Sequence, residues 1–272
     1  MSVAKSRSSR KNFLCMRIDG KKIAQNILFG LLRMPAPKRR MVAVLLGDNQ
    51  ASASFLRHKA AVAQSLGVAF ELVSFLGREQ QADIENAIRS FTADISVGGI
   101  VIQLPVPKKY DKDVFIRAIG AMKDVDNLSG VASVLSPAVS TVESVLTSCG
   151  KRFADYAAVR IVGNGFLVGA PIARFCAANG IPHMIADIGT KDLEGFVRAG
   201  DLVITGVGKT GVVNPDWLTD GVAVIDFGYP PDFDQDSLAR NKGRLAFYTP
   251  TPFGTGPILI AQLFKNFYFL NS

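Results

Sequence analysis

The sequence has few of the residues that build metal centres or disulfide frameworks. Its 272 residues include only three cysteines and two histidines. Cys15, Cys149 and Cys176 are far apart and lack the paired spacing of a zinc site or a disulfide framework. We therefore predict that the protein holds no metal and works in a reducing, intracellular setting.

Long hydrophobic runs are also missing. Gly, Pro or charged residues break every apolar stretch before the roughly 18–20 residues that a membrane span requires. Hydrophobic residues make up 48% and charged residues 20%, values typical of globular proteins, which excludes a disordered or collagen-like chain. The composition predicts a soluble, cytoplasmic protein that does not bind a membrane.

The first fifteen residues contain no acidic side chain and are rich in Ser and Arg. This composition resembles a transit peptide, which leaves an organellar location open. We prefer to interpret residues 1–15 as a disordered leader, or Met16 as the true start. The net charge is +8, and a second basic cluster lies at Lys38, Arg39 and Arg40. Because neither basic segment is interleaved with aromatic residues that could stack on bases, we predict no nucleic-acid partner.

Two series of alternating strands and helices follow from Met41 onward. In the first series, the expected strands are residues 41–46, 69–75 and 99–103, and the expected helices are residues 52–66 and 80–91. In the second, strands are expected at residues 158–162, 183–186, 202–205, 222–226 and 245–248, and helices at residues 168–179, 192–199 and 257–270. Residues 136–151 are expected to join the two series, and residues 230–243 to form a polar excursion. The fold class is therefore α/β, two-lobed, with parallel sheets.

A glycine turn follows the strand expected at residues 158–162. It consists of Gly163, Asn164 and Gly165, and Val168 and Gly169 then open a helix. Glycine lets backbone amides approach a pyrophosphate held at a helix N-terminus. The G-x-G-x-x-x-G spacing is one residue longer than the commonest pattern, and plain strand–helix connectors also contain such turns.

Two further features strengthen the prediction of a dinucleotide site. Asp187 lies about 20 residues on, at the end of the next strand, where a carboxylate accepts from ribose hydroxyls. A second turn, Gly206, Val207 and Gly208, follows the strand at residues 202–205. Ligands of open parallel sheets lie outside the carboxyl ends of the strands, so this turn is expected beside the first, unless it is a simple connector.

The first series carries three candidate polar groups. Lys59 is expected on a helix one turn beyond Phe55, so the two share a face. A lysine in an apolar pocket has a lowered pKa and can transfer protons, although most helical lysines are simply solvated. Gln103 ends a strand before a Pro-rich turn, and Asp126 lies in a loop that either binds a ligand or is an ordinary turn.

These segments, in this order, resemble the methylenetetrahydrofolate dehydrogenase/methenyltetrahydrofolate cyclohydrolase family of the FolD type. The resemblance covers the chain from about Ile18 to its end. Its motifs are Ile18-Asp19-Gly20-Lys21, Leu46-Gly47-Asp48 with Ala51, Ser52 and Lys59, Gln103-Leu104-Pro105-Val106-Pro107, Lys123-Asp124-Val125-Asp126, GNGFLVGAP from Gly163, Val207-Gly208-Lys209, Val224-Ile225-Asp226 and Thr249-Pro250-Thr251-Pro252.

The resemblance implies a two-domain enzyme of one-carbon metabolism with folate in the cleft between the lobes. It oxidises 5,10-methylenetetrahydrofolate to the methenyl compound with NADP and hydrolyses that to 10-formyltetrahydrofolate, as a homodimer. The catalytic domain is expected at residues 16–138, completed by the helix at residues 256–272, and the dinucleotide-binding domain at residues 139–255.

The resemblance also implies roles for individual residues. Lys59 would be the central catalytic residue, Gln103 would tune its charge, and Asp126 would hold the pterin. The substrate side would comprise Ser52, Phe55, Pro105, Gly254, Gly256 and Pro257. The dinucleotide would contact Gly163, Asn164, Gly165, Val168, Gly169, Asp187, Gly206, Val207 and Gly208.

Several positions depart from the family pattern. Phe55 replaces a tyrosine and so lacks a hydroxyl, Asn127 replaces a glycine, Phe253 stands within the family's P-G-G-x-G-P segment, and residues 137–142 have lost most of P-C-T-P-x-G. Asn164-Gly165 replaces Arg-Ser, and Asp187 would repel a 2′-phosphate, which makes NAD a rival to NADP. The alternatives are a monofunctional or weakened homologue, a shikimate-type dehydrogenase and a non-catalytic basic binding protein.

Overall fold

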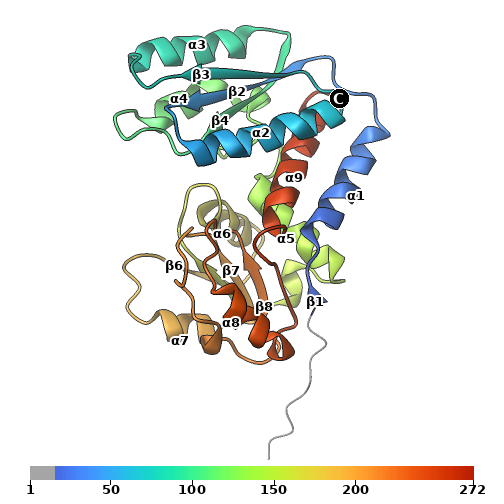
Figure 1. Cartoon of the computed structure of the whole chain (residues 1–272), viewed down its shortest axis with the longest axis vertical. Helices are drawn as coiled ribbons and strands as arrows, with labels where there is room; N and C mark the ends of the chain where they lie inside the picture. Colours follow the sequence, from blue (N-terminus) through green and yellow to red (C-terminus); the bar gives the residue numbers. More distant parts are fainter. Residues whose placement is uncertain (1–15) are drawn as a thin grey trace, which may run out of the picture. The chain divides into compact units, whose positions relative to one another are not determined.

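The computed structural model describes residues 16–272, so the predicted leader and Cys15 lie outside the described residues. The chain divides into two compact units, and each is described by itself (Figure 1). The Lys59 unit comprises Gly20–Arg152 and Gly256–Ser272. Of the described residues, the glycine-turn unit comprises residues 16–19 and Phe153–Thr255. Among the helices of residues 16–272, none is long and apolar enough to cross a membrane.

The Lys59 unit contains a three-stranded parallel sheet in the order β3-β2-β4. The strands are β2 (Arg40–Leu46), β3 (Phe70–Phe75) and β4 (Val97–Gln103). Val44 of β2 lies opposite Val73 and Ile102 of its neighbours. β4 is buried along its whole length, because helices cover both faces of a parallel sheet and such strands therefore consist of continuous apolar runs.

One face of this sheet packs against helices from both ends of the chain. These are α1 (Gly20–Leu32), α2 (Gln50–Ser65) and α9 (Thr255–Leu270). The core there joins Met41 and Leu45 of β2 to Leu56 of α2 and to Phe264 and Phe267 of α9. Two other helices, α3 (Gln81–Ala93) and α4 (Lys112–Ile119), pack against each other. The apolar stripe of α3 predicted from the sequence includes Ile84 and Ile88, and both are buried.

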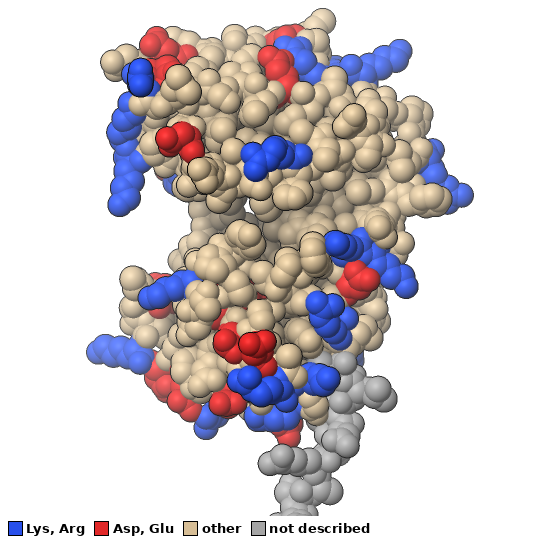
Figure 2. Space-filling model, in the orientation of Figure 1, with Lys and Arg blue, Asp and Glu red and all other residues tan. Residues whose placement is uncertain are grey.

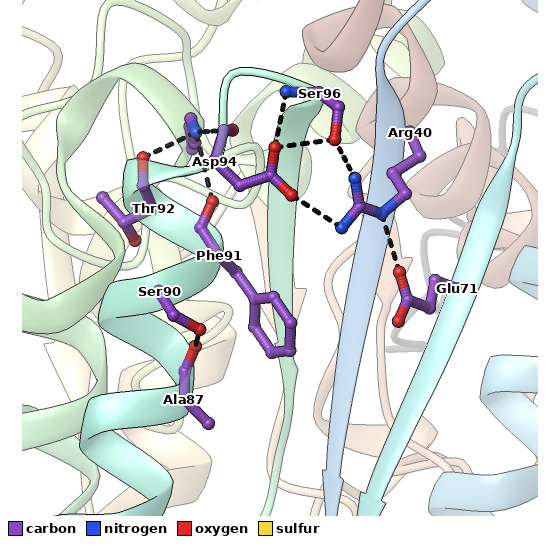
Figure 3. A network of polar contacts seen from close by, with 9 residues as sticks. Arg40, Glu71, Ala87, Ser90, Phe91, Thr92, Asp94 and Ser96 are labelled. Atoms are coloured by element: carbon purple, nitrogen blue, oxygen red, sulfur yellow. Dashed lines mark hydrogen bonds and ion pairs between the residues drawn. The ribbon is translucent and has the colours of Figure 1, made fainter.

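A polar network ties the beginning of β2 to its neighbours. Arg40 donates to Glu71 Oε2 at 2.7 Å, to Asp94 Oδ2 at 2.9 Å and to the Ser96 hydroxyl (Figure 3). Hydrogen bonds from Ser96 and from the Arg40 guanidinium lower the pKa of Asp94 to about 2. Arg40, a residue of the second basic cluster, therefore connects β2 to β3 and to the residues that precede β4.

The glycine-turn unit contains a six-stranded sheet in the order β1-β9-β8-β7-β5-β6, and all its described pairings are parallel. Its strands are β1 (Met16–Arg17), β5 (Val159–Val162), β6 (His183–Ala186), β7 (Leu202–Thr205), β8 (Ala223–Asp226) and β9 (Phe247–Tyr248). Its helices are α6 (Gly169–Ala178), α7 (Leu193–Arg198) and α8 (Gln235–Arg240). Short 3-10 turns complete the chain at Ala121–Lys123, Phe153–Asp155, Pro215–Trp217 and Lys242–Arg244.

The structure corrects two expectations about secondary structure. The supposed connection at residues 136–151 contains α5 (Pro137–Ser148), and the supposed excursion at residues 230–243 contains α8. Ser136 caps α5 by accepting from Val139 N, and Pro137 occupies its first turn. Asp234 caps α8 in the same way through Ser237 N. Helices α1 and α4, which were also not predicted, complete the Lys59 unit.

The division into compact units does not coincide with the domain limits expected from the sequence, and those limits stay a prediction. α5 belongs to the Lys59 unit, so the division by compactness falls at Phe153 rather than at residue 139. α5 contacts α1 in that unit and buries an apolar face there. Met16 and Arg17, expected in the catalytic domain, pair instead with Phe247 and Tyr248 of the glycine-turn unit.

Acidic and basic side chains are interspersed on the face of each unit that Figure 2 shows. The positive net charge of the chain is therefore not gathered into one continuous basic surface on that face. The expectation that the protein has no nucleic-acid partner stays a prediction.

Candidate active site

Lys59 is a buried lysine on α2. Its side chain is 7% exposed, and its Nζ donates to Gln103 Oε1 at 3.2 Å. Gln103, at the end of β4, is 8% exposed and donates its own amide to the Leu104 carbonyl at 3.0 Å. The Gln103 oxygen therefore faces the ammonium group, because the amide nitrogen is already engaged with the backbone.

Helix α2 begins in a way that places three candidate residues on one face. Asn49 caps the helix by accepting from Ser52 N at 2.9 Å. Ser52, Phe55 and Lys59 then follow at intervals of three and four residues, which share a helix face. The Ser52 hydroxyl lies 3.5 Å from the Leu104 carbonyl, and Lys59 Nζ lies 5.6 Å from the centre of the Phe55 ring. Pro105, the remaining candidate on this side, is exposed.

Asp126 is partly exposed and close enough to Lys59 for their charges to interact. Burial lowers the pKa of Lys59, and the Asp126 carboxylate opposes that shift. Burial likewise raises the pKa of Asp126, against the influence of Lys59 and with that of Asp124. The structure thus brings together the three candidate groups Lys59, Gln103 and Asp126, which the chain supplies from α2, β4 and a loop.

The residues beside Asp126 build the loop that carries it. Lys123 donates to the carbonyls of Phe91, Thr92 and Asp94 at the C-terminal end of α3. The buried Asp124 accepts from Leu128 N at 2.9 Å and Ser129 N at 2.8 Å. These neighbours bind the backbone, whereas Asp126 is the acidic residue of this loop whose charge acts on Lys59.

Asn127 has a φ of +49°, in the left-handed region that favours glycine. The family pattern has glycine here, and asparagine is one of the few other residues that adopts this conformation readily. Its side chain donates to the Val134 carbonyl at 2.7 Å and accepts from Ala132 N at 3.1 Å. The substitution therefore keeps the backbone shape and adds two contacts across the loop.

A cavity of about 610 Å³ lies elsewhere in the same unit, among α1, α5 and α9. Asn26, Glu143, Gln262 and Asn266 are among its lining residues, which include none of Lys59, Gln103 and Asp126. It is therefore separate from the cluster around Lys59.

The first glycine turn joins β5 to α6 in the glycine-turn unit. Gly163 has a φ of +97°, and a Cβ there would lie 2.9 Å from Val207 Cγ2. A Cβ on Gly169 would lie 1.7 Å from the Gly163 carbonyl oxygen, and one on Gly206 would lie 2.6 Å from Val168 Cγ1. Glycine is required at Gly163 and Gly206 because the two turns pack closely, as expected for neighbouring strands, and at Gly169 because the first turn folds tightly on itself.

Val168, which precedes the first residue of α6, makes no capping hydrogen bond with its side chain, and the exposed Asn164 and Gly165 lie before it. Ala170 N already donates to the Gly165 carbonyl at 3.0 Å and Pro171 has no N–H, so among the described residues Gly169 N is the amide of this first turn that can serve an anion. The turn therefore stays the candidate site for the pyrophosphate of a dinucleotide, with Gly163, Asn164, Gly165, Val168 and Gly169 as the residues expected from the sequence.

Asp187 lies next to this turn. Gly163 N donates to the Ala186 carbonyl at 2.8 Å, which fixes the end of β6 beside the end of β5. The exposed Asp187 accepts from Gly189 N through Oδ1 at 2.8 Å. Within residues 16–272, no hydrogen bond reaches its Oδ2. One carboxylate oxygen therefore remains available to a ribose hydroxyl.

The second glycine turn has its amides engaged by a residue that the sequence did not single out. Asp232, which is fully buried, accepts from Val207 N at 2.8 Å, Gly208 N at 2.7 Å and Lys209 N at 3.0 Å. These amides bind a carboxylate of the chain itself, so any contribution of Gly206, Val207 and Gly208 to a ligand comes from other atoms. No local pattern marks Asp232, because it lies more than twenty residues after the turn.

A second buried carboxylate lies behind Asp232. Asp226 accepts from the Thr205 hydroxyl at 3.0 Å, from Gly228 N at 2.7 Å and from Asp232 N at 3.0 Å. Burial, together with the charge of Asp232, raises the pKa of Asp226 to about 6. This pair of acids anchors the ends of β7 and β8.

The third glycine segment leads into α9. Gly254 is buried, and a Cβ there would lie 2.3 Å from the Pro250 carbonyl. Phe253, where the family pattern has glycine, has a φ of +77°, which is strained for a bulky residue. Gly254 belongs to the glycine-turn unit, whereas Gly256 and Pro257 belong to the Lys59 unit.

Within the described residues, no group of three or more His, Cys, Asp or Glu side chains could hold a metal ion. The recognisable elements are a parallel sheet with a glycine turn at a helix N-terminus and, in the other unit, a buried lysine beside an amide and a carboxylate. The first of these places the protein among the dinucleotide-binding α/β proteins.

Comparison with known proteins identifies the family. Residues 18–126 match the catalytic domain of tetrahydrofolate dehydrogenase/cyclohydrolase, and residues 136–271 match the NAD(P)-binding domain of the same enzymes. The chain therefore belongs to the tetrahydrofolate dehydrogenase/cyclohydrolase family, as the motifs of the sequence predicted.

Individual relatives support this assignment. The chain is 31% identical to the Bifunctional protein FolD 2 of Ectopseudomonas mendocina, across 92% of this chain and 89% of that protein. The crystal structure of FolD from Campylobacter jejuni is 26% identical, with a TM-score of 0.85 over 94% of this chain and 98% of that one. FolD from Trypanosoma brucei, complexed with NADP cofactor and inhibitor, is 25% identical, with a TM-score of 0.86 over 94% and 97%. A shikimate-type dehydrogenase is not favoured by these matches.

Proposed function

We propose that this chain catalyses two consecutive reactions on one folate: oxidation of 5,10-methylenetetrahydrofolate to 5,10-methenyltetrahydrofolate, and hydrolysis of that product to 10-formyltetrahydrofolate. The family assignment supports both activities. The observation that carries the proposal is the contact of the buried Lys59 Nζ with Gln103 Oε1, beside the charge of Asp126.

Lys59 suits the hydrolytic step. Water must add to the bridging carbon, one carbon–nitrogen bond must break, and the attacking water must lose a proton. Because burial lowers the pKa of Lys59, its amine loses a proton more readily than an exposed lysine and can accept the proton of the water. Gln103 orients the amine through its oxygen, and the Asp126 carboxylate keeps the pKa of Lys59 from falling further.

We propose that Asp126 also binds the substrate. Its carboxylate would accept hydrogen bonds from the amino and N–H groups of the pterin ring, which are charge-assisted and therefore strong. Phe55, 5.6 Å from Lys59 Nζ, would stack on an aromatic part of the substrate. Ser52 and Pro105, and Gly254, Gly256 and Pro257 of the third segment, remain proposed substrate residues.

The replacement of Lys59 by Met tests this proposal. Methionine keeps the length and apolar stem of the side chain but cannot move a proton. We expect hydrolysis of the methenyl compound to fall on the order of 10²–10⁴-fold. Dinucleotide affinity should stay within about twofold, because the glycine turn belongs to the other unit. The exposed Lys38→Met is the matched control, and unchanged hydrolysis in Lys59→Met would remove Lys59 from the mechanism.

The expected coenzyme is NADP, which the Trypanosoma brucei relative binds. Bound to the turn, the coenzyme supplies the oxidising power of the first reaction. The residues of the turn and Asp187 would hold its pyrophosphate and ribose. Asp187 favours NAD as the rival, since its free oxygen suits a ribose hydroxyl and its charge repels a 2′-phosphate.

The role of Asp187 is tested by titrating the protein with the reduced form of each coenzyme, NADH and NADPH, and measuring the two affinities from the fluorescence of the coenzyme. If Asp187 discriminates as its charge suggests, NAD binds at least as tightly as NADP, and Asp187→Ser shifts the preference towards NADP. NADP binding at least tenfold tighter than NAD in the unaltered protein would refute that role.

Two further properties are proposed by family resemblance. The enzyme would act in the cytoplasm, with an organellar location open because of the composition of its first residues, and it would form a homodimer. Light scattering on the purified full chain gives the oligomeric state directly.

A further inference from the structure

Asn266 connects α9 to the loop that carries Asp126. Its side-chain amide donates to the Val125 carbonyl at 2.9 Å and to the Leu135 carbonyl at 2.9 Å. Val125 immediately precedes Asp126 and is fully buried, and Asn266 is only 7% exposed. Both hydrogens of one buried amide are therefore used on carbonyls that flank Asp126 in the chain.

The other polar contacts of this loop reach different partners. Lys123 fixes the beginning of the loop to α3, and Asp124 and Asn127 connect the loop to itself. Among the described residues, Asn266 is the side chain whose hydrogen bonds tie the loop to α9 across more than a hundred residues of sequence, beside the apolar packing of Val125. It also acts at the residue next to Asp126, where a small displacement has the largest effect on the carboxylate.

We propose that Asn266 is a positioning residue, which holds the Asp126 carboxylate opposite Lys59 by fixing the carbonyls of Val125 and Leu135. This inference rests on the proposed function, because it assigns the support of a residue in the same site. Without the two hydrogen bonds, the loop gains freedom, and Asp126 spends less time facing Lys59 and the pterin.

The neighbouring Gln262 offers a matched control. It lies one helical turn before Asn266 on α9, is 3% exposed, and donates to Ser140 O at 3.3 Å and Ser144 Oγ at 2.7 Å of α5. Both amides line the same cavity among α1, α5 and α9. Truncating either one enlarges that cavity and removes two hydrogen bonds, but only Asn266 contacts the loop of Asp126.

The experiment compares Asn266→Ala and Gln262→Ala in the full chain. We expect Asn266→Ala to raise the KM for the methenyl substrate about tenfold with a smaller change in kcat, and Gln262→Ala to change both less than twofold. The hydrolytic pH profile of Asn266→Ala should shift towards lower pH, because the Asp126 carboxylate raises the pKa of Lys59. Asn266→Ser, which keeps one donor, should fall between the unaltered protein and Asn266→Ala.

A double-mutant cycle tests whether the effect passes through Asp126. Folic acid serves as the probe, with its Kd measured by calorimetry. The penalty of Asn266→Ala should largely disappear in an Asp126→Ala background. The same penalty in both backgrounds, or equal effects of Asn266→Ala and Gln262→Ala, would overturn the proposal, as would failure of both Asn266 variants to fold.

The two levels of inference fail differently. If the unaltered chain neither binds folic acid nor turns over the folate substrates, the proposed function is wrong. If it does both and Asn266→Ala behaves like Gln262→Ala, only the role of Asn266 is wrong.

Discussion

At the scale of single residues, the candidate site contains Lys59, which matches the family pattern, and Phe55, which departs from it. Lys59 contacts Gln103 as the resemblance implied, whereas Phe55 stands where the pattern has tyrosine. The Phe55 ring centre lies 5.6 Å from Lys59 Nζ. A hydroxyl on this ring would reach the neighbourhood of the amine, where it could donate or accept a proton.

The replacement Phe55→Tyr is therefore an informative gain of function. We expect kcat/KM for hydrolysis to rise about tenfold, less than the roughly 10²–10⁴-fold that a fully positioned proton-transfer group contributes. Phe29→Tyr, at an exposed phenylalanine on α1, serves as the control. A steady-state assay at several pH values measures the effect, and unchanged hydrolysis in Phe55→Tyr would show that the missing hydroxyl does not limit the enzyme.

The sequence allowed some of these residues to be found and concealed others. Lys59, Gln103 and Asp126 lie within recognisable motifs, so their candidacy required no coordinates. Asp232 and Asn266 act on backbone atoms that are distant in sequence, at Val207 and Val125. No local sequence pattern reveals such a contact. The residues next to Asp232 and Asn266 in the sequence do not distinguish them from aspartates and asparagines that lie on a protein surface.

At the scale of elements, the predicted strands and helices whose apolar periodicity is strong were found close to their expected limits. The runs around β2, β4 and β7 are continuous and apolar, which is the pattern of buried parallel strands. α5 is rich in Val, Ser and Thr, which have modest helix propensity, and packing of its buried face offsets this. β1 has only two residues, too few for any periodicity.

The turn after β7 provides a prediction at the scale of elements. Asp232 holds three successive amides of this turn, and the turn packs on the first glycine turn. Asp232→Ala should loosen both and weaken dinucleotide binding about tenfold, a loss equivalent to roughly 1.4 kcal/mol. Fluorescence titration with NADPH measures it. Asp236→Ala, on the nearby α8, should have little effect, and equal affinities of the two variants would contradict the role of Asp232.

At the scale of the whole molecule, the buried Asp226 links stability to pH. Its folded-state pKa of about 6 lies above the ordinary value of 3.8. The folded chain therefore binds this proton more tightly than the unfolded chain, and the resulting stability is lost as pH rises through 6. Between pH 8 and pH 5, Asp226 should add about 1.4 kcal/mol to the free energy of unfolding.

Urea unfolding of the unaltered protein and of Asp226→Asn at both pH values measures this contribution. The gain in stability from pH 8 to pH 5 should be larger in the unaltered protein than in Asp226→Asn. The comparison of the two gains removes the effects of other groups that titrate in both proteins. Equal gains would show that Asp226 does not titrate in this window.

The path of the chain through its two units has a consequence for biosynthesis. Ile260, Phe264 and Phe267 of α9 belong to the core of a unit whose other residues end at Arg152. A ribosome makes these side chains only after the whole intervening segment Phe153–Thr255 has been synthesised. Until then, part of the apolar surface of Gly20–Arg152 stays uncovered. We therefore expect a nascent chain stalled before Thr255 to depend on chaperones and to be sensitive to proteolysis.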